Sequence, residues 1–297
     1  NIKELKKIKI EDALVKILSN PNHSNKSWIT SQYDQMVMCD TMQKSGSDAA
    51  IIRIHNKDKA IAMSVDSSAN YCKSFPLTGG KQIVCENWRN LISVGAKPLA
   101  ITNCLNFGNP ENKEIMGEFA ECLEGIKEAC EFLDYPVVSG NVSFYNGTNK
   151  KNISPTPVIG GVGLIKKLSK PLSHNFINTD STLLVIGKTF GHLEQSVFLK
   201  EIYSINKGMP PEVNLRNEKN NGECLLKLIN KNFILSSHDI STGGLIVALA
   251  EMSIGSNIGV KIHKPKRLTN SINYFFGEDQ ARYLIEVNNK DIPKVDK

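Results

Sequence analysis

Two short clusters of glycine, amide and hydroxyl residues follow apolar runs, an arrangement suited to holding a metal-bound phosphate group. They are ITNCLNFGNP at 101–110 and VVSGNVSFYN at 137–146. Glycine lets a ligand approach the main chain, while Asn and Ser offer oxygens to a cation or hydrogen bonds to phosphate. If both clusters end buried strands that are neighbours in one sheet, their polar groups face a single crevice at its carboxyl edge. The candidates are Asn103, Asn106, Gly140, Asn141 and Ser143. The alternative is that these residues are ordinary turn formers that cap strands.

A third segment, SSHDISTGGLIVALAEMSIG at 236–255, joins a strand to an apolar helix through a polar loop. Gly243 and Gly244 would leave the amide groups of the helix N-terminus exposed, which makes the segment a candidate anion site. The spacing is not that of a P-loop. Ser241 or Thr242 is explained equally well as a side-chain cap of the helix.

Two further pairs are candidates for proton transfer or phosphate binding. His238 and Asp239 can form an acid/base pair, although a loop histidine that hydrogen-bonds to the backbone is commoner. Asp66 ends a predicted strand, and Lys81 follows two glycines that open a predicted helix, where it can approach a phosphate. A solvated lysine in a first helical turn explains Lys81 equally well.

Composition narrows the class of protein. The 297 residues, 40% apolar and 22% charged, suffice for one large globular domain or two ordinary ones. No apolar run approaches the roughly 20 residues of a membrane span, and the charged, amphipathic start does not resemble a signal peptide. Seven cysteines without CxxC spacing predict reduced thiols and a cytoplasmic protein. The net charge of +6 is modest, and its one dense run, KIHKPKR at 261–267, is interpreted as a solvated loop. We therefore expect no membrane or nucleic-acid partner.

The order of predicted elements indicates an α/β or α+β architecture. An N-terminal helix at 10–18 and a linker through 46 precede a first domain over 47–167. A polar segment containing a proline separates it from a second unit over 178–297. Apolar alternation and β-rich runs predict strands at 49–55, 60–65, 98–105, 135–140, 155–165, 181–189, 233–239, 259–263 and 281–287. Helices are predicted at 81–96, 114–133, 193–203, 222–230 and after the paired glycines, with a loop at 74–80.

Several motifs together resemble one enzyme family. They are QYD at 32–34, GGKQ at 79–82, NLISVGAKPLAITNCLNFGNPE at 90–111, PVVSGNVSFYN at 136–146, PTPVIGGVGL at 155–164 and HDISTGGLIVALAEM at 238–252. In this order they resemble the second half of the large catalytic subunit of phosphoribosylformylglycinamidine synthase, in its separate-glutaminase form. This family lies within the aminoimidazole ribonucleotide synthetase-like superfamily.

The resemblance implies a fold and a reaction. The fold is an N-terminal α/β domain whose strands form a barrel with a sister copy, followed here by an incomplete C-terminal α/β domain. The reaction is that of a ligase in de novo purine biosynthesis. ATP and Mg2+ activate the amide oxygen of formylglycinamide ribonucleotide, and ammonia displaces the phosphate to give the amidine, ADP and phosphate. The ammonia comes from a separate glutaminase subunit, with the help of a small third subunit.

The resemblance also assigns roles to the strand-end clusters. Asn103 and Gly140 correspond to ATP contacts, Asn141 to a magnesium ligand and Ser143 to a contact of the ribonucleotide substrate. Phosphoryl transfer of this kind depends on charge neutralisation and positioning.

The chain departs from the family pattern at four positions, of which Asn103 is one of the residues just named. Asn103 stands where the family usually has aspartate, and Asn70 stands where it has arginine. Phe75 replaces an acidic residue, and Thr242 replaces the usual aspartate of the HD-x-S-D-GG motif. Each change removes a charge near an expected phosphate site.

The family's catalytic histidines belong to the first half, which this sequence lacks, so we expect no catalytic residue here and no activity from this chain alone. The GEDQ segment, 277–280, resembles a copy of a substrate-loop motif that lines a non-catalytic site. Three hypotheses follow: one half of a composite enzyme, a degenerate nucleotide-binding module, or a complete kinase or synthetase of the superfamily. The amphipathic N-terminal helix argues against the third. A first half or a second copy is the expected partner of the barrel strands.

Overall fold

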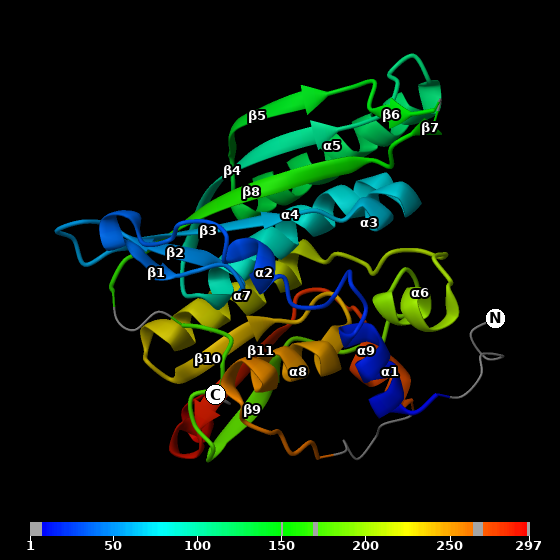
Figure 1. The fold of residues 1–297 in the computed structure, drawn as a ribbon. Helices are drawn as coiled ribbons and strands as arrows, with labels where there is room; N and C mark the ends of the chain where they lie inside the picture. The colour runs from blue at the N-terminus through cyan, green and yellow to red at the C-terminus, as the bar shows by residue number, and fades with distance from the viewer. Residues whose placement is uncertain (1–7, 150, 169–171, 264–269, 296–297) are drawn as a thin grey trace.

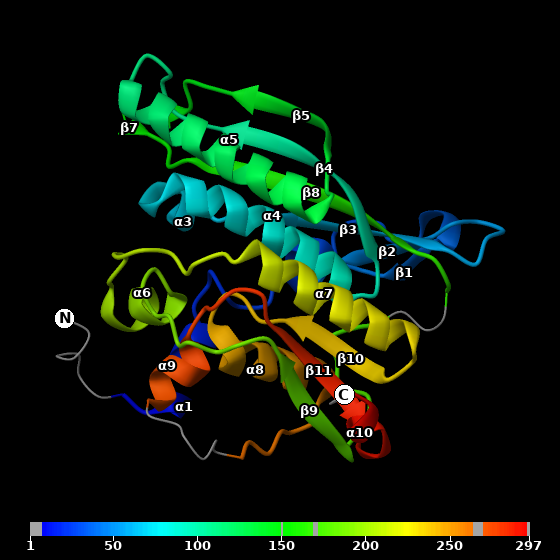
Figure 2. The ribbon, with the colours of Figure 1, turned by 180° about the vertical axis from the view of Figure 1, so that it is seen from behind.

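The computed structural model describes residues 8–149, 151–168, 172–263 and 270–295 of the chain. Two α/β units stack on each other, one built on a six-stranded sheet and the other on a three-stranded sheet (Figures 1 and 2). This is the mixed α/β class that the sequence predicts. No helix in these ranges has the length and apolar character that crossing a membrane requires.

The larger sheet has the strand order β1-β2-β3-β8-β4-β5. Its strands are β1 (Thr41–Gln43), β2 (Ala50–Arg53), β3 (Ala60–Asp66), β4 (Lys97–Asn106), β5 (Val137–Ser143) and β8 (Thr156–Ile165). All neighbours are antiparallel except β4 and β5, which run parallel. The helix α5 (Lys113–Leu133) connects these two strands, because a parallel pair needs a crossover connection. A short hairpin of β6 (Gly147–Thr148) and β7 (Lys151–Asn152) follows β5.

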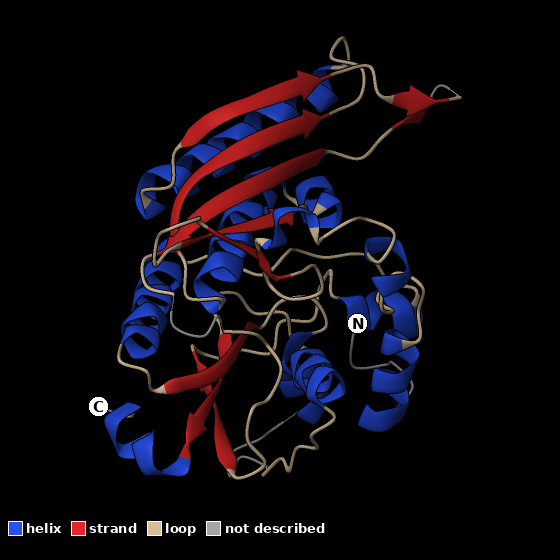
Figure 3. Cartoon of the chain, turned by 60° about the vertical axis from the view of Figure 1, so that its left-hand side comes forward, coloured by secondary structure: helices blue, strands red, loops and turns tan. Residues whose placement is uncertain are grey.

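Helices cover one face of this sheet. α3 (Ala69–Ser74), α4 (Pro76–Ser93) and α5 lie behind the strands in Figure 3. On the opposite face, the segment that contains Thr30 and Tyr33 lies against Ala50 and Ile52 of β2, while apolar side chains of β3, β4 and β8 remain exposed. The face of α4 with apolar side chains at three-to-four-residue spacing is buried, as the sequence predicts. Its buried apolar residues are Ile83, Val84, Trp88, Leu91 and Ile92. The open face exposes apolar side chains of β3, β4 and β8, which are Ile61, Met63, Val65, Leu99 and Val162.

The loop predicted at 74–80 is wrong, because α4 begins at Pro76 and includes both glycines. Proline is favoured at the first position of a helix, where its missing N–H costs no hydrogen bond. A Cβ on Gly79 would collide with the backbone of Cys72, and one on Gly80 would collide with the carbonyl oxygen of Cys122. These glycines therefore allow α3 and α5 to pack closely on α4.

The second unit contains the antiparallel sheet β10-β11-β9. Its strands are β9 (Ser181–Ile186), β10 (Ile234–Asp239) and β11 (Tyr283–Asn288). Its helices are α6 (Val197–Tyr203), α7 (Leu215–Asn230), α8 (Gly244–Ser256), α9 (Ser271–Phe276) and α10 (Ile292–Val295), with a 3-10 turn at Asn289–Asp291. The strand predicted at 259–263 is wrong, because this segment is exposed and pairs with no strand of the sheet. Of the basic run at 261–267, the last four residues lie outside the described ranges.

The N-terminal segment joins both units. α1 (Ile10–Leu18) has the predicted bounds and packs against α6 and α8 of the second unit. The chain then passes through α2 (Ser27–Thr30) and a 3-10 turn at Val37–Cys39 before it enters β1. The beginning of the amphipathic start, residues 1–7, lies outside the described ranges.

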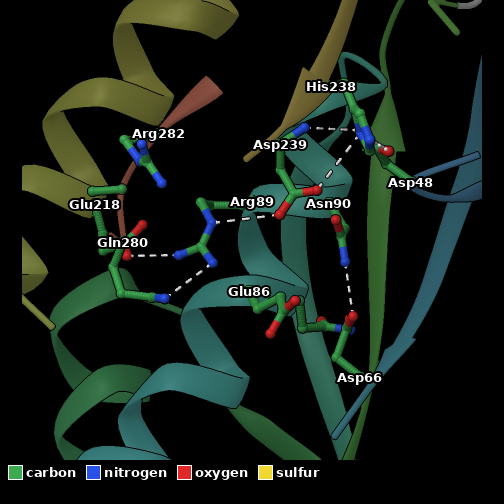
Figure 4. Close-up of polar contacts among 12 residues, drawn as sticks. Asp48, Asp66, Glu86, Arg89, Asn90, Glu218, His238, Asp239, Gln280 and Arg282 are labelled. Carbon is green, nitrogen blue, oxygen red and sulfur yellow. Dashed lines mark hydrogen bonds and ion pairs between the residues drawn. The ribbon is translucent and has the colours of Figure 1, made fainter. Parts of the chain in front are cut away.

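A fully buried arginine fixes the interface between the two units. Arg89, on α4, binds Glu218 of α7 through Nη1 at 2.7 Å and donates from Nη2 to Gln280 Oε1 at 3.1 Å (Figure 4). Its Nε lies 3.8 Å from Asp239 Oδ2 at the end of β10. A guanidinium group presents its donors in a rigid planar fork, so these partners determine how the units are placed relative to each other.

We expect that replacing Arg89 with methionine lowers the free energy of unfolding by about 3–5 kcal/mol, since it leaves two buried carboxylates without their cation. Urea unfolding followed by circular dichroism measures the loss. The control is Arg53→Met, which removes an arginine that pairs with Asp40 and is 45% exposed; its expected cost is at most about 1 kcal/mol. Equal losses for the two variants would contradict the role given to Arg89.

Candidate functional site

The two polar clusters lie side by side, because β4 and β5 are paired in parallel. Asn103 is paired with Gly140, and Asn106 is paired with Ser143. The carboxyl ends of the two strands therefore meet at one edge of the sheet, and the prediction that they are neighbours is confirmed.

The prediction that both strands are buried is wrong for β5. Val137 is 45% exposed, Val138 is 70% exposed and Val142 is 51% exposed. β5 is the last strand of the sheet order, with β4 as its neighbour. The valines therefore indicate an apolar edge that is open in this chain and available to another protein segment.

The five candidates at this edge do not all lie on one face of the sheet. A Cβ on Gly140 would collide with Asn103 Oδ1 and would lie 2.5 Å from the carbonyl oxygen of Asn103. Glycine at 140 thus makes room for the side chain of its strand neighbour. Because side chains alternate along a strand, Asn106 lies on the face opposite to Asn103, together with Asn141 and Ser143. The single crevice expected from the sequence is therefore divided between two faces.

Hydrogen bonds orient most of the polar side chains on the second face. Asn106 Nδ2 donates to the carbonyl oxygen of Thr156 at 3.2 Å. Asn146 Nδ2 donates to the carbonyl oxygen of Ser143 at 2.9 Å and to Ser143 Oγ at 3.1 Å. Asn141 is exposed, and within the described ranges its amide makes no side-chain hydrogen bond. Asn141 is thus the candidate whose oxygen is available to a ligand.

His238 and Asp239 lie at the end of β10, so the expectation of a loop histidine is wrong. His238 Nδ1 lies 2.6 Å from Asp48 Oδ1 (Figure 4). Its Nε2 lies 3.1 Å from Glu251 Oε2. Burial alone would lower the pKa of His238, but the negative charge of Asp48 and the close contacts with Asp48 and Glu251 raise it well above its usual value. Burial, followed by the charge of Asp48, raises the pKa of Asp239 to about 8. An imidazolium held between carboxylates is poorly suited to act as a general base. No motif or spacing in the sequence marks Asp48 as a candidate site residue.

The anion site predicted at the start of α8 is filled by the protein itself. Glu278 Oε1 accepts hydrogen bonds from the backbone N–H of Gly243 and of Val197, both at 2.8 Å. Its other oxygen accepts from Tyr71 Oη at 2.7 Å, across the interface between the two units. Gly243, with φ of 79°, is the residue that precedes the helix, so the predicted side-chain caps Ser241 and Thr242 are wrong. Gly244 has a φ of 72° and lies against backbone carbonyl groups, with 2.6 Å between its ideal Cβ and the oxygen of Gly277.

Asp66 lies at the end of β3 in a buried, polar environment. Its carboxylate accepts hydrogen bonds from Ser64 Oγ at 2.9 Å, Asn87 Nδ2 at 2.7 Å and Asn90 Nδ2 at 2.8 Å. Burial, followed by the negative charge of Glu86, raises the pKa of Asp66 to about 7. Asp66 is therefore partly protonated near neutral pH, unlike the strand-end asparagines, whose amide groups do not titrate.

Lys81 forms an ion pair with Glu128 of α5. Because α4 begins at Pro76, Lys81 lies in its second turn and not at the start of a helix, as the sequence suggested. The two charge-loss positions after Asp66 lie nearby in the chain: Asn70 is an exposed residue of α3, and Phe75 immediately precedes α4 and is half exposed.

The GEDQ segment is buried and holds a loop. Asp279 accepts hydrogen bonds from the backbone N–H of Phe190 and Gly191 at 2.8 Å and of His192 at 3.1 Å. A cavity of about 270 Å³ lies beside this segment, with Phe190, His192 and Asp279 in its lining. GEDQ resembles a substrate-loop motif, and no pattern in the sequence indicates this structural role.

Comparison with known proteins identifies the class. Residues 46–165 match the AIR synthase related protein, N-terminal domain, and residues 180–295 match the AIR synthase related protein, C-terminal domain. The chain belongs to the AIR synthase related protein family. Its open sheet is consistent with an incomplete form of this fold.

One curated relative and three solved structures show which members of the family the chain is similar to. The chain is 58% identical over 294 residues to phosphoribosylformylglycinamidine synthase subunit PurL of Pelagibacter ubique. The match covers 99% of this chain but only 40% of that relative's length. Three solved structures from Thermotoga maritima are each 25% identical to this chain. PurLQS has a TM-score of 0.64, and the match covers 90% of this chain and 38% of its own. The values are 0.61, 89% and 38% for PurL complexed with ATP, and 0.63, 90% and 37% for PurL complexed with FGAR.

We expect that Gly140→Ala destabilises the protein by about 1–3 kcal/mol, because the added methyl group forces Asn103 and the neighbouring backbone to move. The control is Gly117→Ala on the exposed side of α5, where an added Cβ meets no atom within 4 Å. There alanine should stabilise the helix by up to about 1 kcal/mol. Chemical denaturation compares the two, and a neutral Gly140→Ala would mean that β4 and β5 are not in this contact.

Proposed function

We propose that this chain is part of a phosphoribosylformylglycinamidine synthase, a ligase of de novo purine biosynthesis in the cytoplasm. The whole enzyme converts formylglycinamide ribonucleotide and glutamine-derived ammonia to the amidine, with ATP cleaved to ADP and phosphate. The chain contributes the strand edge that holds the nucleotide. It is inactive alone, because the family's catalytic histidines belong to the first half. Its own His238 is held in ion pairs with Asp48 and Glu251.

The observation that carries the proposal is the parallel pairing of Asn103 with Gly140. It brings the two polar clusters to one strand edge in a chain that is 58% identical to a PurL subunit. Asn103 and Gly140 form the contact surface for ATP, and Ser143, oriented by Asn146, faces the ribonucleotide. The remaining sequence candidates, among them Asp66 and Lys81, have protein partners that support structural roles.

Magnesium fits the donors at this edge. Asn141 offers an exposed amide oxygen, and Mg2+ prefers oxygen ligands while it keeps several waters and binds phosphate oxygens. Bound magnesium would neutralise charge on the phosphate groups of ATP. Asn141 would hold the ion on one face of the strand edge, and Asn103, on the other face, supplies shape without charge. Nucleotide affinity would therefore depend more heavily on the ion than in relatives with aspartate at the position of Asn103.

The open face of the six-stranded sheet supports the proposed partner. Met63 and Val162, which are paired across β3 and β8, belong to its exposed apolar set. A first half of the enzyme, or a second copy of this chain, covers this face and closes the barrel. The glutaminase subunit and the small third subunit complete the assembly, in keeping with the PurLQS structure. Seven free cysteines fit a reducing cytoplasm.

A second candidate function is that of a non-catalytic nucleotide-binding half. The neutral Asn103 favours it, as does the filling of the α8 anion site by Glu278. Thr242, in the same loop, adds no charge that would attract a phosphate group. Such a module binds nucleotide but contributes no turnover when the first half is supplied, whereas the synthase half restores activity.

We expect the chain to bind Mg-ATP or Mg-ADP in calorimetric titration, with and without an added first half. Asn141→Leu should weaken binding by at least about tenfold, or about 1.4 kcal/mol, and Asn103→Asp should tighten it by restoring charge. The control is Asn220→Leu, the same change at an exposed residue of α7. Absence of binding in both settings, or equal binding by the two leucine variants, would count against the proposed nucleotide edge.

We expect the isolated chain to self-associate through its open sheet face, because contiguous exposed apolar surface favours burial. Sedimentation velocity over a range of concentrations measures the association. The double variant Met63→Lys/Val162→Lys places two charges on this face and should shift the chain toward monomer. Ile254→Lys, at a 70% exposed position of α8, is the control and should leave association unchanged. A wild-type chain that stays monomeric would refute this surface as a contact between copies.

A further inference from the structure

A compact group of metal-ligating side chains lies at the seam between the two units, away from the strand-end asparagines. Asp48 comes from the segment before β2, and His238 and Asp239 end β10 (Figure 4). Glu251 lies on α8. One ligand atom from each of Asp48, His238 and Asp239 lies within 4.8 Å of the other two. The nucleotide edge does not use any of them.

Two carboxylates compete for one nitrogen in this group. His238 Nδ1 lies 2.6 Å from Asp48 Oδ1 and 3.7 Å from Asp239 Oδ1. The contacts of Nδ1 lack hydrogen-bond geometry, so that Nδ1 is a buried atom without a hydrogen-bond partner among the described residues, as is Asp239 Oδ2. Asp239 is only 4% exposed, and its Oδ2 lies against Arg89. The atoms that face one another are therefore Nδ1 of His238 and the Oδ1 atoms of Asp48 and Asp239.

The group also carries excess negative charge. Three carboxylates, those of Asp48, Asp239 and Glu251, surround the imidazole of His238. The nearest further cation, Arg89, lies 3.8 Å from Asp239 and is shared with the buried Glu218. A second imidazole, that of His174, lies beside the His238 ring with 5.3 Å between ring centroids and contacts Ser47 Oγ. The carboxylates of Asp48 and Glu251 alone outnumber the one imidazolium between them, and a divalent ion would balance this charge.

We propose that Asp48, His238 Nδ1 and Asp239 bind one divalent transition-metal ion of the zinc or cobalt type. Zinc–nitrogen and zinc–oxygen bonds of about 2.0–2.2 Å place ligand atoms roughly 3.0–3.5 Å apart. The observed separations of 2.6 and 3.7 Å from Nδ1 bracket that range, and all three ligand atoms lie within 4.8 Å of one another. Side-chain movement that brings the two carboxylates closer together would complete the site. The ion takes the place of the proton on Nδ1, because only neutral imidazole is a ligand.

The surroundings of His238 support this ion class. Glu251 Oε2 lies 3.1 Å from Nε2, which fixes the ring and makes the opposite nitrogen a better ligand, as carboxylates do behind zinc-bound histidines. An imidazole ligand suits zinc or cobalt, whereas magnesium prefers oxygen alone. Because Asp48 belongs to the first unit and the other two ligands to the second, the ion links the units and stabilises their contact.

The test is a titration of the chelator-treated full chain with Co2+ at pH 8, followed by visible absorption, and with Zn2+ by calorimetry. We expect one ion per chain, displacement of Co2+ by Zn2+, no displacement by excess Mg2+, and a higher melting temperature with Zn2+. His238→Ala and Asp48→Asn should each abolish the Co2+ absorption. Glu251→Gln, which keeps the ligands and alters only the support of the ring, should weaken binding by about 10–100-fold.

The matched control is His55→Ala, which removes a half-exposed histidine that lies 2.7 Å from Asp40 in the same kind of pair. It should bind Co2+ like the wild type. Circular dichroism shows which variants are folded, and the folded ones among His238→Ala, Asp48→Asn and Glu251→Gln decide the outcome. Failure of the wild-type chain to bind Co2+ overturns the proposal, as does unchanged binding in the folded variants. Competition by Mg2+ equal to that by Zn2+ overturns the assigned ion class.

Discussion

The guanidinium group of Arg89 is excluded from water between the two units, and its charge obliges the surrounding elements to meet around it. A buried charge without partners would be very costly, so Glu218 of α7, Gln280 before β11 and Asp239 of β10 all converge on one helix position. Since Asp239 follows His238 in β10, the same constraint sets the distance from His238 to Asp48. The seam between the units is therefore organised from its buried cation outward.

The same logic explains the acidic segment that connects α9 to β11. Glu278 accepts amide hydrogen bonds at the start of α6 and of α8, and Asp279 accepts three from the loop that contains Phe190. Helix N-termini attract anions whether the anion is a ligand or a side chain. Here a carboxylate of the chain fills the position that a glycine-led helix offers to phosphate. A motif with the composition of an anion site can thus serve the fold alone.

Local pattern predicted much of the architecture, because periodicity records which face of an element is buried. It located α1, the buried face of α4 and the neighbouring strands β4 and β5. It failed where burial depends on residues distant in sequence: Arg89 meets partners 129 and 191 positions away, and charged residues in a helix ordinarily indicate a solvated surface. The burial predicted for the valines of β5 was wrong for the opposite reason. A run of apolar residues predicts burial, but β5 is the last strand of the sheet among the described residues.

The strand edge that carries the proposed nucleotide contacts is partly complete and partly open. The contact of Asn103 with Gly140 is formed within the chain, because the missing Cβ lets the two strands approach. The valines of β5 and the uncovered face of the sheet are left exposed, and an apolar surface of this kind gains free energy when it is covered. A partner that binds there also excludes water from the neighbouring edge, which strengthens polar contacts to a charged ligand. The proposed assembly and the proposed nucleotide binding would therefore be coupled through this edge of the sheet.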